Sequence, residues 1–554
     1  MIYEIGFVLT ATTQARVLAV ATFVLWLGVA SEAAGAALAW AGGKRRWGGA
    51  VLTALLALAL VAKSTVLARW LAAEPGAAAV RLESYYLGIL QLLLLARVAY
   101  RGLWMNRALA FARVSPRVLL IGSYLGLIAV GAALLKLPRA TTAPGALSWL
   151  DAFFTSTSAV CVTGLIVVDT ATVFTELGQM IILGLIQLGG LGLMTFAYFF
   201  VSLLAGITLR DRAILLDYLN EENVGRITQM LVAIVVLTFA FEVAGALLLH
   251  LASPVGARSW LDSVFHAISA FCNAGFSTYA LGLYDPTTRS NLSYQSVVMV
   301  LIVVGGLGFP VLKNLWDAAW ARLRHPAHRP PRLTLHTRLV LVTTAALLVG
   351  GTVAVWVLER VLNGPAAPAA GGLAATFMSV TTRTAGFNTV PIESLAAATA
   401  QVVILLMFIG GAPASTAGGM KVTTFAVALL NAVRTLRAPE SELVAFGRTI
   451  PAAVATRAFA LVLLAVGWCA VTSLLLMVLM PRAAPLDVIF ESVSAFATVG
   501  LSRGLTPELH DAARLVLIVS MIVGRIGILY AAISMLGGHN RGRVTYPRES
   551  VVIS

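Results

Sequence analysis

Charged residues are scarce in this chain of 554 residues, in which 11% are Asp, Glu, Lys or Arg and 59% are hydrophobic. About a quarter of the residues in a typical soluble domain are charged. The composition therefore excludes an ordinary soluble fold and places the chain in a lipid bilayer. Apolar stretches of about 20 residues, enough to span a membrane, recur from Val17–Trp40 to Leu515–Leu536.

Cysteine is also rare in this sequence. Cys161, Cys272 and Cys469 lie within apolar or loop segments and lack the spacing of a metal site. This pattern predicts neither a disulfide framework nor a zinc site. We expect the three thiols to pack as small buried side chains.

Patterns that mark catalysis or nucleotide binding are missing. Seven histidines are scattered, no Ser/His/Asp grouping is evident, and no glycine-rich phosphate loop follows a predicted strand. We therefore expect neither an enzyme nor a cofactor in this chain. The net charge of +15 comes from short loops beside apolar spans rather than from a basic amphipathic face, so nucleic acid is not an expected partner.

Four short stretches of the chain resemble one another, and each lies between two apolar spans. Their central glycines are 111, 111 and 114 residues apart, at Gly164, Gly275, Gly386 and Gly500. Even spacing of this kind indicates one element copied four times. The alternative, four unrelated tight turns at helix contacts, does not explain the regular spacing.

The sequence predicts an all-α polytopic membrane protein with four helix–pore-loop–helix repeats around a pseudo-fourfold axis. The repeats are expected at 116–228, 229–337, 338–457 and 458–554, after an amino-terminal region of 1–115 with three spans near 15–41, 48–71 and 84–100. The outward helices are predicted at Val118–Leu137, Met230–Leu251, Leu339–Leu362 and Ala458–Met480. The returning helices are predicted at Glu176–Leu204, Ser296–Trp320, Ala400–Val433 and Arg514–Leu536.

Lys and Arg are distributed unevenly between the two sides of the predicted spans. Segments 101–117, 205–228, 313–338, 434–457 and 538–554 carry 20 of them, and the opposite side of the four repeats carries eight. Since positive loops stay in the cytoplasm, the glycine loops enter from outside and the carboxyl terminus is cytoplasmic. We expect the protein in the plasma membrane, with its amino terminus outside.

A short half-helix is predicted before each glycine loop. Asp151, Asp262 and Asp487 each lie 13 residues before the glycine, whereas the third repeat has Leu373 there. A carboxylate at this end is expected to accept backbone N–H groups and to match the positive end of the helix dipole. The negative end then points toward the axis of the four repeats.

Glycine is needed at each loop centre because successive carbonyls face one ion only if the backbone takes a positive φ. Irregular backbone at membrane depth is tolerated when it is buried or lines a water-filled path. We therefore interpret the four loops as a cation pore. Unlike the TVGYG loop of tetrameric K⁺ channels, no second glycine follows two residues later, so we expect weaker selectivity against Na⁺.

A break is predicted within the third returning helix, where two glycine pairs flank Pro413. Proline costs about 3 kcal/mol and glycine about 1 kcal/mol in a helix interior, so we expect a loop below the filter. In the fourth returning helix, Arg525 lies at membrane depth and is expected to oppose cation passage or to form an ion pair.

Five other polar side chains lie in predicted spans, half-helices or loops. Glu242 is interpreted as the partner of a buried positive charge, with ion coupling as the alternative, and Lys421 as an anchor of the 410–420 segment. Glu491 and His266 are expected to form hydrogen bonds behind the filter, and Arg383 to brace the third loop.

Several motifs in this order resemble the Ktr/Trk/HKT superfamily of potassium transporters, most closely its KtrB-type membrane subunits. They are Gln187–Thr195, Leu333–Arg338, Met407–Phe425, Phe446–Pro451, Gly524–Gly527 and Tyr546–Ser554. The resemblance implies K⁺ transport, a homodimer in membrane lipid, and a cytosolic RCK-type ring that binds ATP or ADP. The first 115 residues lie outside it.

The resemblance also assigns residues to the pore. It implies a K⁺-binding filter of backbone carbonyls from Val162, Thr163, Gly164, Asn273, Ala274, Gly275, Thr384, Ala385, Gly386, Thr498, Val499 and Gly500. It implies a gate formed by Gly410, Gly411, Pro413, Ser415, Thr416, Gly418, Gly419, Lys421 and Arg525.

Two other functions are also compatible with the sequence. A secondary transporter that couples K⁺ to Na⁺ or H⁺ also has broken helices, although such folds are usually built from two halves rather than four quarters. A scaffold or assembly subunit is the other alternative, and it predicts no cation flux through the purified chain.

Overall fold

The computed structural model describes residues 116–143, 145, 147–203, 224–254, 259–324, 333–438 and 441–527. The chain divides into two compact bodies, one of residues 1–113, 137–140 and 200–207, and the other of 114–136, 141–199 and 208–554. The fold below is that of the second body. The three predicted amino-terminal spans and the carboxyl-terminal tail after 527 lie outside the described residues.

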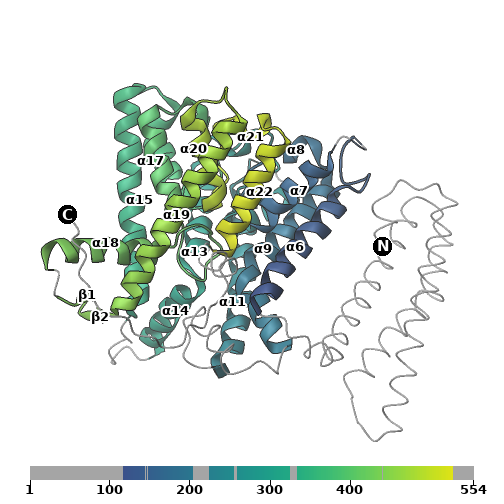
Figure 1. Ribbon diagram of the computed structural model, residues 1–554. Helices are drawn as coiled ribbons and strands as arrows, with labels where there is room; N and C mark the ends of the chain where they lie inside the picture. The colour runs from purple at the N-terminus through teal and green to yellow at the C-terminus, as the bar shows by residue number, and fades with distance from the viewer. Residues whose placement is uncertain are drawn as a thin grey trace, which may run out of the picture. The chain divides into compact units, whose positions relative to one another are not determined.

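Helices form nearly all of the regular structure in the described part of the chain (Figure 1). The exception there is a hairpin of β1 (Leu443–Ala445) and β2 (Arg448–Ile450), which pair antiparallel with Val444 opposite Thr449. The hairpin and α18 (Val422–Arg437) lie at one end of the helices, and the short helices α8 (Thr170–Val173) and α21 (Leu505–Glu508) lie at the other (Figure 1).

The same order of elements occurs four times. A long helix comes first in each segment: α6 (Pro116–Leu135), α11 (Val224–Ala252), α15 (Leu335–Leu362) and α19 (Ala452–Leu479). A half-helix of 10 to 13 residues follows: α7 (Trp149–Val160), α12 (Trp260–Phe271), α16 (Gly372–Thr381) and α20 (Pro485–Ala497). A loop comes next and ends each half-helix. We number these segments one to four.

The returning part of each segment is a helix or a broken pair of helices. These are α9 (Glu176–Leu203), α13 (Leu292–Leu307) with α14 (Phe309–Arg324), α17 (Ala397–Phe408) with α18 (Val422–Arg437), and α22 (Asp511–Ile526). Three single-turn helices lie in the connections: η4 (Gly282–Tyr284), η5 (Pro368–Ala370) and η6 (Ile392–Ser394).

Helices suited to a bilayer are present among the described residues. Ala233–Ala252, Leu335–Leu362 and Ala452–Leu479 are long and apolar enough to cross a membrane, and α13 with α14 makes a fourth candidate if the bent pair is one span. Ile121–Leu135, Glu176–Leu191, Gly372–Thr381 and Ala397–Phe408 are shorter apolar helices. Large apolar side chains such as Val243, Val361 and Val478 are exposed on the long helices, as expected for a membrane protein.

The second returning helix is broken, so the predicted continuous helix over Ser296–Trp320 is wrong. Helices α13 and α14 meet at Gly308 with a bend of 100°. Gly308 has a φ of 85°, and Phe309 N donates to Ala414 O at 3.1 Å instead of continuing the helix ladder. The bend therefore depends on a contact with the third segment, which the local sequence does not reveal.

The third returning helix is broken where the sequence predicts. Helix α17 ends at Phe408 and α18 begins at Val422. Between them the chain doubles back, with Gly410 N donating to Met420 O at 2.8 Å and Val422 N donating to Gly411 O at 2.9 Å. We call residues 409–421 the crossing segment.

The hydrophobic core lies around the half-helices and joins neighbouring segments. One apolar cluster brings Phe265 of α12 against α7, and another brings Phe377 of α16 against Phe271 of α12. A third cluster joins α16 to α20 through Met378 and Phe490. The fourth joins α22 back to α7 through Met521 and Phe154, so the apolar contacts run around all four segments.

Candidate functional site

The starts of the first two half-helices are capped by serine rather than by aspartate. Ser148 Oγ accepts from Asp151 N at 3.0 Å, and Ser259 Oγ accepts from Asp262 N at 3.3 Å. This corrects the predicted role of the carboxylates as acceptors of backbone N–H groups. A hydroxyl three residues earlier takes that role, as Ser and Asp both favour helix starts.

The aspartates instead bind side chains outside their half-helices. Asp151 Oδ1 pairs with Arg514 Nη1 of α22 at 2.6 Å, and Asp487 Oδ1 pairs with Arg503 Nε at 2.6 Å. Asp262 Oδ1 accepts from Thr278 Oγ1 at 2.7 Å. Each carboxylate therefore joins the start of a half-helix to an element that follows a glycine loop.

The four loops share one backbone conformation. Each has a positive φ at its central glycine and again two residues earlier, a combination that L-residues adopt rarely. The earlier residues are Val162 (56°), Asn273 (59°), Thr384 (71°) and Thr498 (51°), and the glycines are Gly164 (88°), Gly275 (71°), Gly386 (78°) and Gly500 (92°).

The backbone N–H groups of these loops point back to the half-helices. Thr163 N donates to Ser158 O at 2.7 Å, Ala274 N to Ser269 O at 2.7 Å, and Val499 N to Ser494 O at 2.9 Å. In the third loop Ala385 N donates to Thr381 O at 2.9 Å. Because a trans peptide directs its C=O opposite to its N–H, the carbonyls of the preceding residues point away from the half-helices.

The twelve carbonyl oxygens predicted to form the filter lack hydrogen-bond donors within the described part of the chain. Nine of their residues are buried, and among these Thr163, Thr384 and Val499 are 0% exposed, while Gly275, Gly386 and Gly500 are partly buried. Buried carbonyls without a partner are costly in a folded protein. Nine together, in four equivalent loops, indicate a shared ligand.

A hydroxyl near the end of each half-helix fixes its loop. Ser269 Oγ donates to Phe276 O at 2.8 Å, and Ser494 Oγ donates to Leu501 O at 2.7 Å. In the first segment Ser158 Oγ accepts from Gly164 N at 3.0 Å. Each bond holds the loop at the glycine or at the residue after it.

The equivalent hydroxyl in the third segment belongs to Thr381, which donates to Phe387 O at 2.7 Å. Ser379, two residues earlier, donates to Leu348 O instead. The third half-helix is offset by one residue relative to the other three. For this reason the sequence did not predict the role of Thr381.

The four glycines pack against one another in a closed cycle. A Cβ placed on Gly164 would collide with the carbonyl oxygen of Ala274, and one on Gly275 would collide with that of Ala385. The cycle continues from Gly386 to Val499 and returns from Gly500 to Thr163. The loops therefore form one ring in chain order, with no space for a side chain at the glycine positions.

The crossing segment lies against the ends of the half-helices. Thr416 Oγ1 donates to Phe271 O of α12 at 3.1 Å. A Cβ on Gly418 would collide with the side chain of Thr498, and one on Gly419 would approach Ala497. The segment thus contacts the second and fourth segments directly below their loops.

Two buried cations, Arg383 and Arg525, and the partly buried Lys421 donate to backbone carbonyls at the crossing segment. Arg383 Nη2 donates to Gly410 O at 2.8 Å, and Lys421 Nζ donates to Ala417 O at 2.7 Å. Arg525 Nη1 donates to Thr416 O, and its Nη2 donates to Gly189 O of α9 at 2.6 Å. Arg525 therefore ties the crossing segment to the first and fourth segments. The ion pair that the sequence offered as an alternative for Arg525 is not among the contacts of the described residues.

Glu242 of α11 is buried beside the second loop. It accepts from Gln187 Nε2 at 3.2 Å and from Cys272 Sγ at 3.8 Å. Among the described residues its hydrogen-bond partners are neutral, and the predicted positive partner is not among them. The predicted hydrogen bonds of Glu491 and His266 are confirmed, as detailed below.

Known proteins share both the sequence and the fold. Residues 123–537 match the TrkH family, whose members are cation transport proteins. The Ktr system potassium uptake protein B of Bacillus subtilis is 40% identical over 458 residues, covering 79% of this chain and 96% of that protein. The potassium/sodium uptake protein NtpJ of Enterococcus hirae is 36% identical over 456 residues, covering 80% of this chain and 98% of that protein.

The structure is also similar to the crystal structure of the potassium transporter TrkH from Vibrio parahaemolyticus. The TM-score is 0.63 at 19% sequence identity, and the match covers 88% of this chain and 97% of that one. At this identity the likeness concerns the fold. Taken with the family match over most of its length, it shows that this chain belongs to the TrkH family of cation transport proteins.

Proposed function

We propose that this protein mediates K⁺ uptake across the plasma membrane through a channel-like pore along the axis of the glycine ring. The observation that supports this is the closed ring of four loops whose twelve carbonyls, nine of them on buried residues, have no donor among the described residues. Rings of carbonyl oxygens replace the hydration shell of K⁺ in known filters. In this proposal the four segments are repeats of one pore unit, with the boundaries expected from the sequence.

The half-helices favour a cation at the same place. Each ends within a few residues of its glycine, and the partial negative charge at a helix carboxyl end stabilises positive charge. Four such ends around one ring offset part of the lost hydration energy. The transported ion is K⁺ and the protein itself needs no cofactor.

The choice of K⁺ is supported by the relatives. Proteins 36–40% identical to this chain are named for potassium uptake, and one of them for potassium and sodium. Glycine at all four loop centres is, by the family resemblance, the arrangement of potassium-preferring members. The missing second glycine in each loop leads us to expect imperfect exclusion of Na⁺.

The crossing segment is the proposed gate. Its contacts with Phe271, Thr498 and Arg525 place it against the ends of the half-helices, where it blocks an ion that leaves the ring. The guanidinium of Arg525 adds a positive field that opposes cations. Release of Thr416 from these contacts is the proposed opening step.

Assembly and regulation are proposed from the relatives. The Bacillus subtilis proteins are named as components of a Ktr system, which suggests a second subunit. We propose a homodimer in membrane lipid with a cytosolic RCK-type ring, which binds ATP or ADP and docks on the basic cytoplasmic loops. The carboxyl terminus is then cytoplasmic.

Reconstitution of the full chain in liposomes tests the proposed function. We expect uptake of ⁸⁶Rb⁺ that external K⁺ inhibits more strongly than Na⁺ does, and current steps of single channels. Flux strictly tied to Na⁺ or H⁺ movement would contradict a channel and favour the coupled transporter. A folded chain without any cation flux would refute K⁺ transport.

A further inference from the structure

One buried position behind the loops differs in chemistry between the four segments. It directly follows the buried phenylalanines Phe154, Phe265, Phe377 and Phe490, and it holds Thr155, His266, Met378 and Glu491. In the second and fourth segments this side chain binds a serine two residues after the glycine. His266 Nε2 lies 2.9 Å from Ser277 Oγ, and Ser502 Oγ lies 2.5 Å from Glu491 Oε1.

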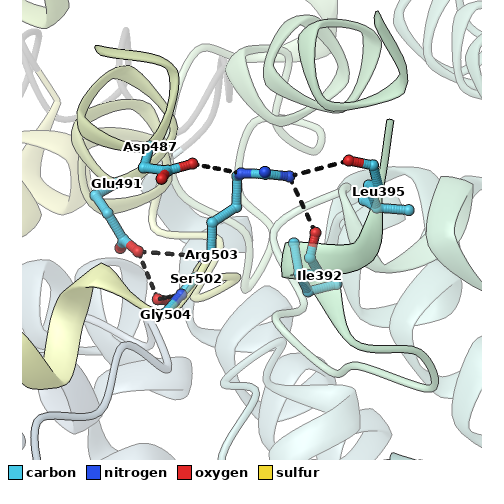
Figure 2. A network of polar contacts seen from close by, with 7 residues as sticks. All are labelled: Ile392, Leu395, Asp487, Glu491, Ser502, Arg503 and Gly504. Carbon is cyan, nitrogen blue, oxygen red and sulfur yellow. Dashed lines mark hydrogen bonds and ion pairs between the residues drawn. The ribbon is translucent and has the colours of Figure 1, made fainter. Parts of the chain in front are cut away.

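Glu491 accepts hydrogen bonds from three donors of the chain that follows Gly500. Besides Ser502, Arg503 N donates to Oε1 at 3.2 Å and Thr506 Oγ1 donates to Oε2 at 2.6 Å. The side chain is 0% exposed. Figure 2 shows the carboxylate between α20 and the chain that leaves the fourth loop. A buried carboxylate with three donors is a strong anchor, because hydrogen bonds to charged groups are stronger than neutral ones.

Arg503 extends this anchor to the third segment. Its Nε pairs with Asp487 of α20 at 2.6 Å, while Nη1 donates to Ile392 O at 3.1 Å (Figure 2). A longer contact of 3.5 Å reaches Leu395 O. Asp487, Glu491 and Arg503 thus fix the outer side of the fourth loop to its own half-helix and to the neighbouring segment.

His266 forms a comparable anchor in the second segment. Its Nδ1 lies 2.8 Å from Asp262 O, and since a carbonyl only accepts, Nδ1 carries the proton. Nε2 therefore accepts from Ser277 Oγ. The imidazole stacks on Tyr279, with ring centroids 4.7 Å apart, and lies beside Phe387 of the third segment at 6.4 Å.

The first and third segments lack this anchor. Thr155 Oγ1 is buried and has no hydrogen-bond partner within the described residues. Met378 has no polar group to offer, and the residues two after the glycines are Ile166 and Asn388. Because the loops follow chain order around the ring, the second and fourth lie on opposite sides. The polar anchors therefore hold two facing loops.

We propose that Glu491 and His266 are positioning residues that hold facing carbonyls of the ring at the separation that K⁺ requires, and so determine selectivity against Na⁺. This inference rests on the proposed function. The carbonyl of Gly500 lies between two fixed points, since Gly500 N donates to Ser494 Oγ at 3.1 Å and Glu491 holds Ser502. Loss of the second point lets the loop contract around a smaller ion.

Permeability ratios of K⁺ to Na⁺, from reversal potentials of the full chain in planar bilayers, test the inference. Ser502→Ala removes one donor to Glu491 but keeps its other two, so the fold should persist. We expect a roughly tenfold fall in the K⁺/Na⁺ ratio, equivalent to about 1.4 kcal/mol, while ⁸⁶Rb⁺ flux continues. Ser277→Ala should act in the same direction, and the double variant should exceed either single one.

Thr155→Val is the matched control, because it removes a hydroxyl at the equivalent position of a segment without an anchor. Its ratio should equal that of the wild type. Conducting Ser502→Ala and Ser277→Ala variants with wild-type ratios would overturn the inference and leave the proposed function intact. A wild-type chain that is folded but conducts no cation would instead refute the proposed function itself.

Discussion

Gly500 packs against the carbonyl oxygen of Thr163, so the loop of the fourth segment lies directly beside that of the first. This contact closes the cycle that Gly164, Gly275 and Gly386 begin. Because each loop of the closed ring packs against the next one, a loop cannot shift to admit a new side chain without displacing its neighbour. Substitutions at the ring should therefore affect transport more than those at other glycines with a positive φ.

Gly500→Ala should abolish most ⁸⁶Rb⁺ uptake in liposomes. The left-handed conformation costs about 1–2 kcal/mol for a residue with a Cβ, and this Cβ also collides with the first loop. Gly364→Ala is the control, because Gly364 has a φ of 84° but no atom within 4 Å of its Cβ position. Equal uptake by the two variants would show that backbone strain alone, and not the ring, determines the effect.

Arg525→Ala should raise the rate of ⁸⁶Rb⁺ uptake, because it removes a positive charge and two bonds that hold Thr416 O and Gly189 O. A barrier lowered by about 1.4 kcal/mol corresponds to a roughly tenfold faster flux. Arg437→Ala, at the exposed end of α18, should leave uptake unchanged. Slower uptake by a correctly folded Arg525→Ala protein would contradict the proposed barrier.

Thr416→Val should also increase uptake, by a smaller factor. The change removes the bond of 3.1 Å to Phe271 O, and a neutral hydrogen bond contributes about 0.5–1.5 kcal/mol. Thr435→Val, which removes a hydroxyl bonded within α18 to Asn431 O, is the control for the loss of a threonine hydroxyl. If the Thr416→Val and Thr435→Val variants transport ⁸⁶Rb⁺ at the same rate, the hydrogen bond from Thr416 to Phe271 O does not keep the gate closed.

Asp151→Asn should lower the free energy of unfolding by about 1.5–3 kcal/mol, as expected for a hydrogen bond to a charged group. Asp151 and Arg514 are 14% and 19% exposed, so solvent weakens the pair little. Unfolding in detergent measures the loss, and a double-mutant cycle with Arg514→Gln isolates the pair. Asp511→Asn is the control: Asp511 is 85% exposed and 3.9 Å from Arg514, so an effect near zero is expected. A coupling energy of zero in the cycle would mean that the pair does not stabilise the fold.

The family and the local features of the four loops could be predicted from the sequence. The resemblance carried by the six motifs from Gln187–Thr195 to Tyr546–Ser554 is confirmed by the TrkH family match. The break in the third returning helix was also predictable, since glycine pairs and proline disfavour a helix wherever they occur. Such features depend on steric limits within a few residues, so they can be predicted from the local sequence.

Misassignments arose where a partner lies far along the chain. The bend at Gly308 accompanies a bond from Phe309 to Ala414, and Asp151 pairs with Arg514 at a separation of 363 residues. No local pattern distinguishes these choices.

The amino-acid order thus established a helical membrane protein of the TrkH family, with four glycine loops of positive φ after short half-helices. The folded chain decided which loops are neighbours, that the cycle closes between Gly500 and Thr163, and that Arg525 reaches Gly189 across 336 residues. The difference is physical. A backbone conformation follows from steric limits within a few residues, whereas a contact between distant residues depends on how all the helices pack.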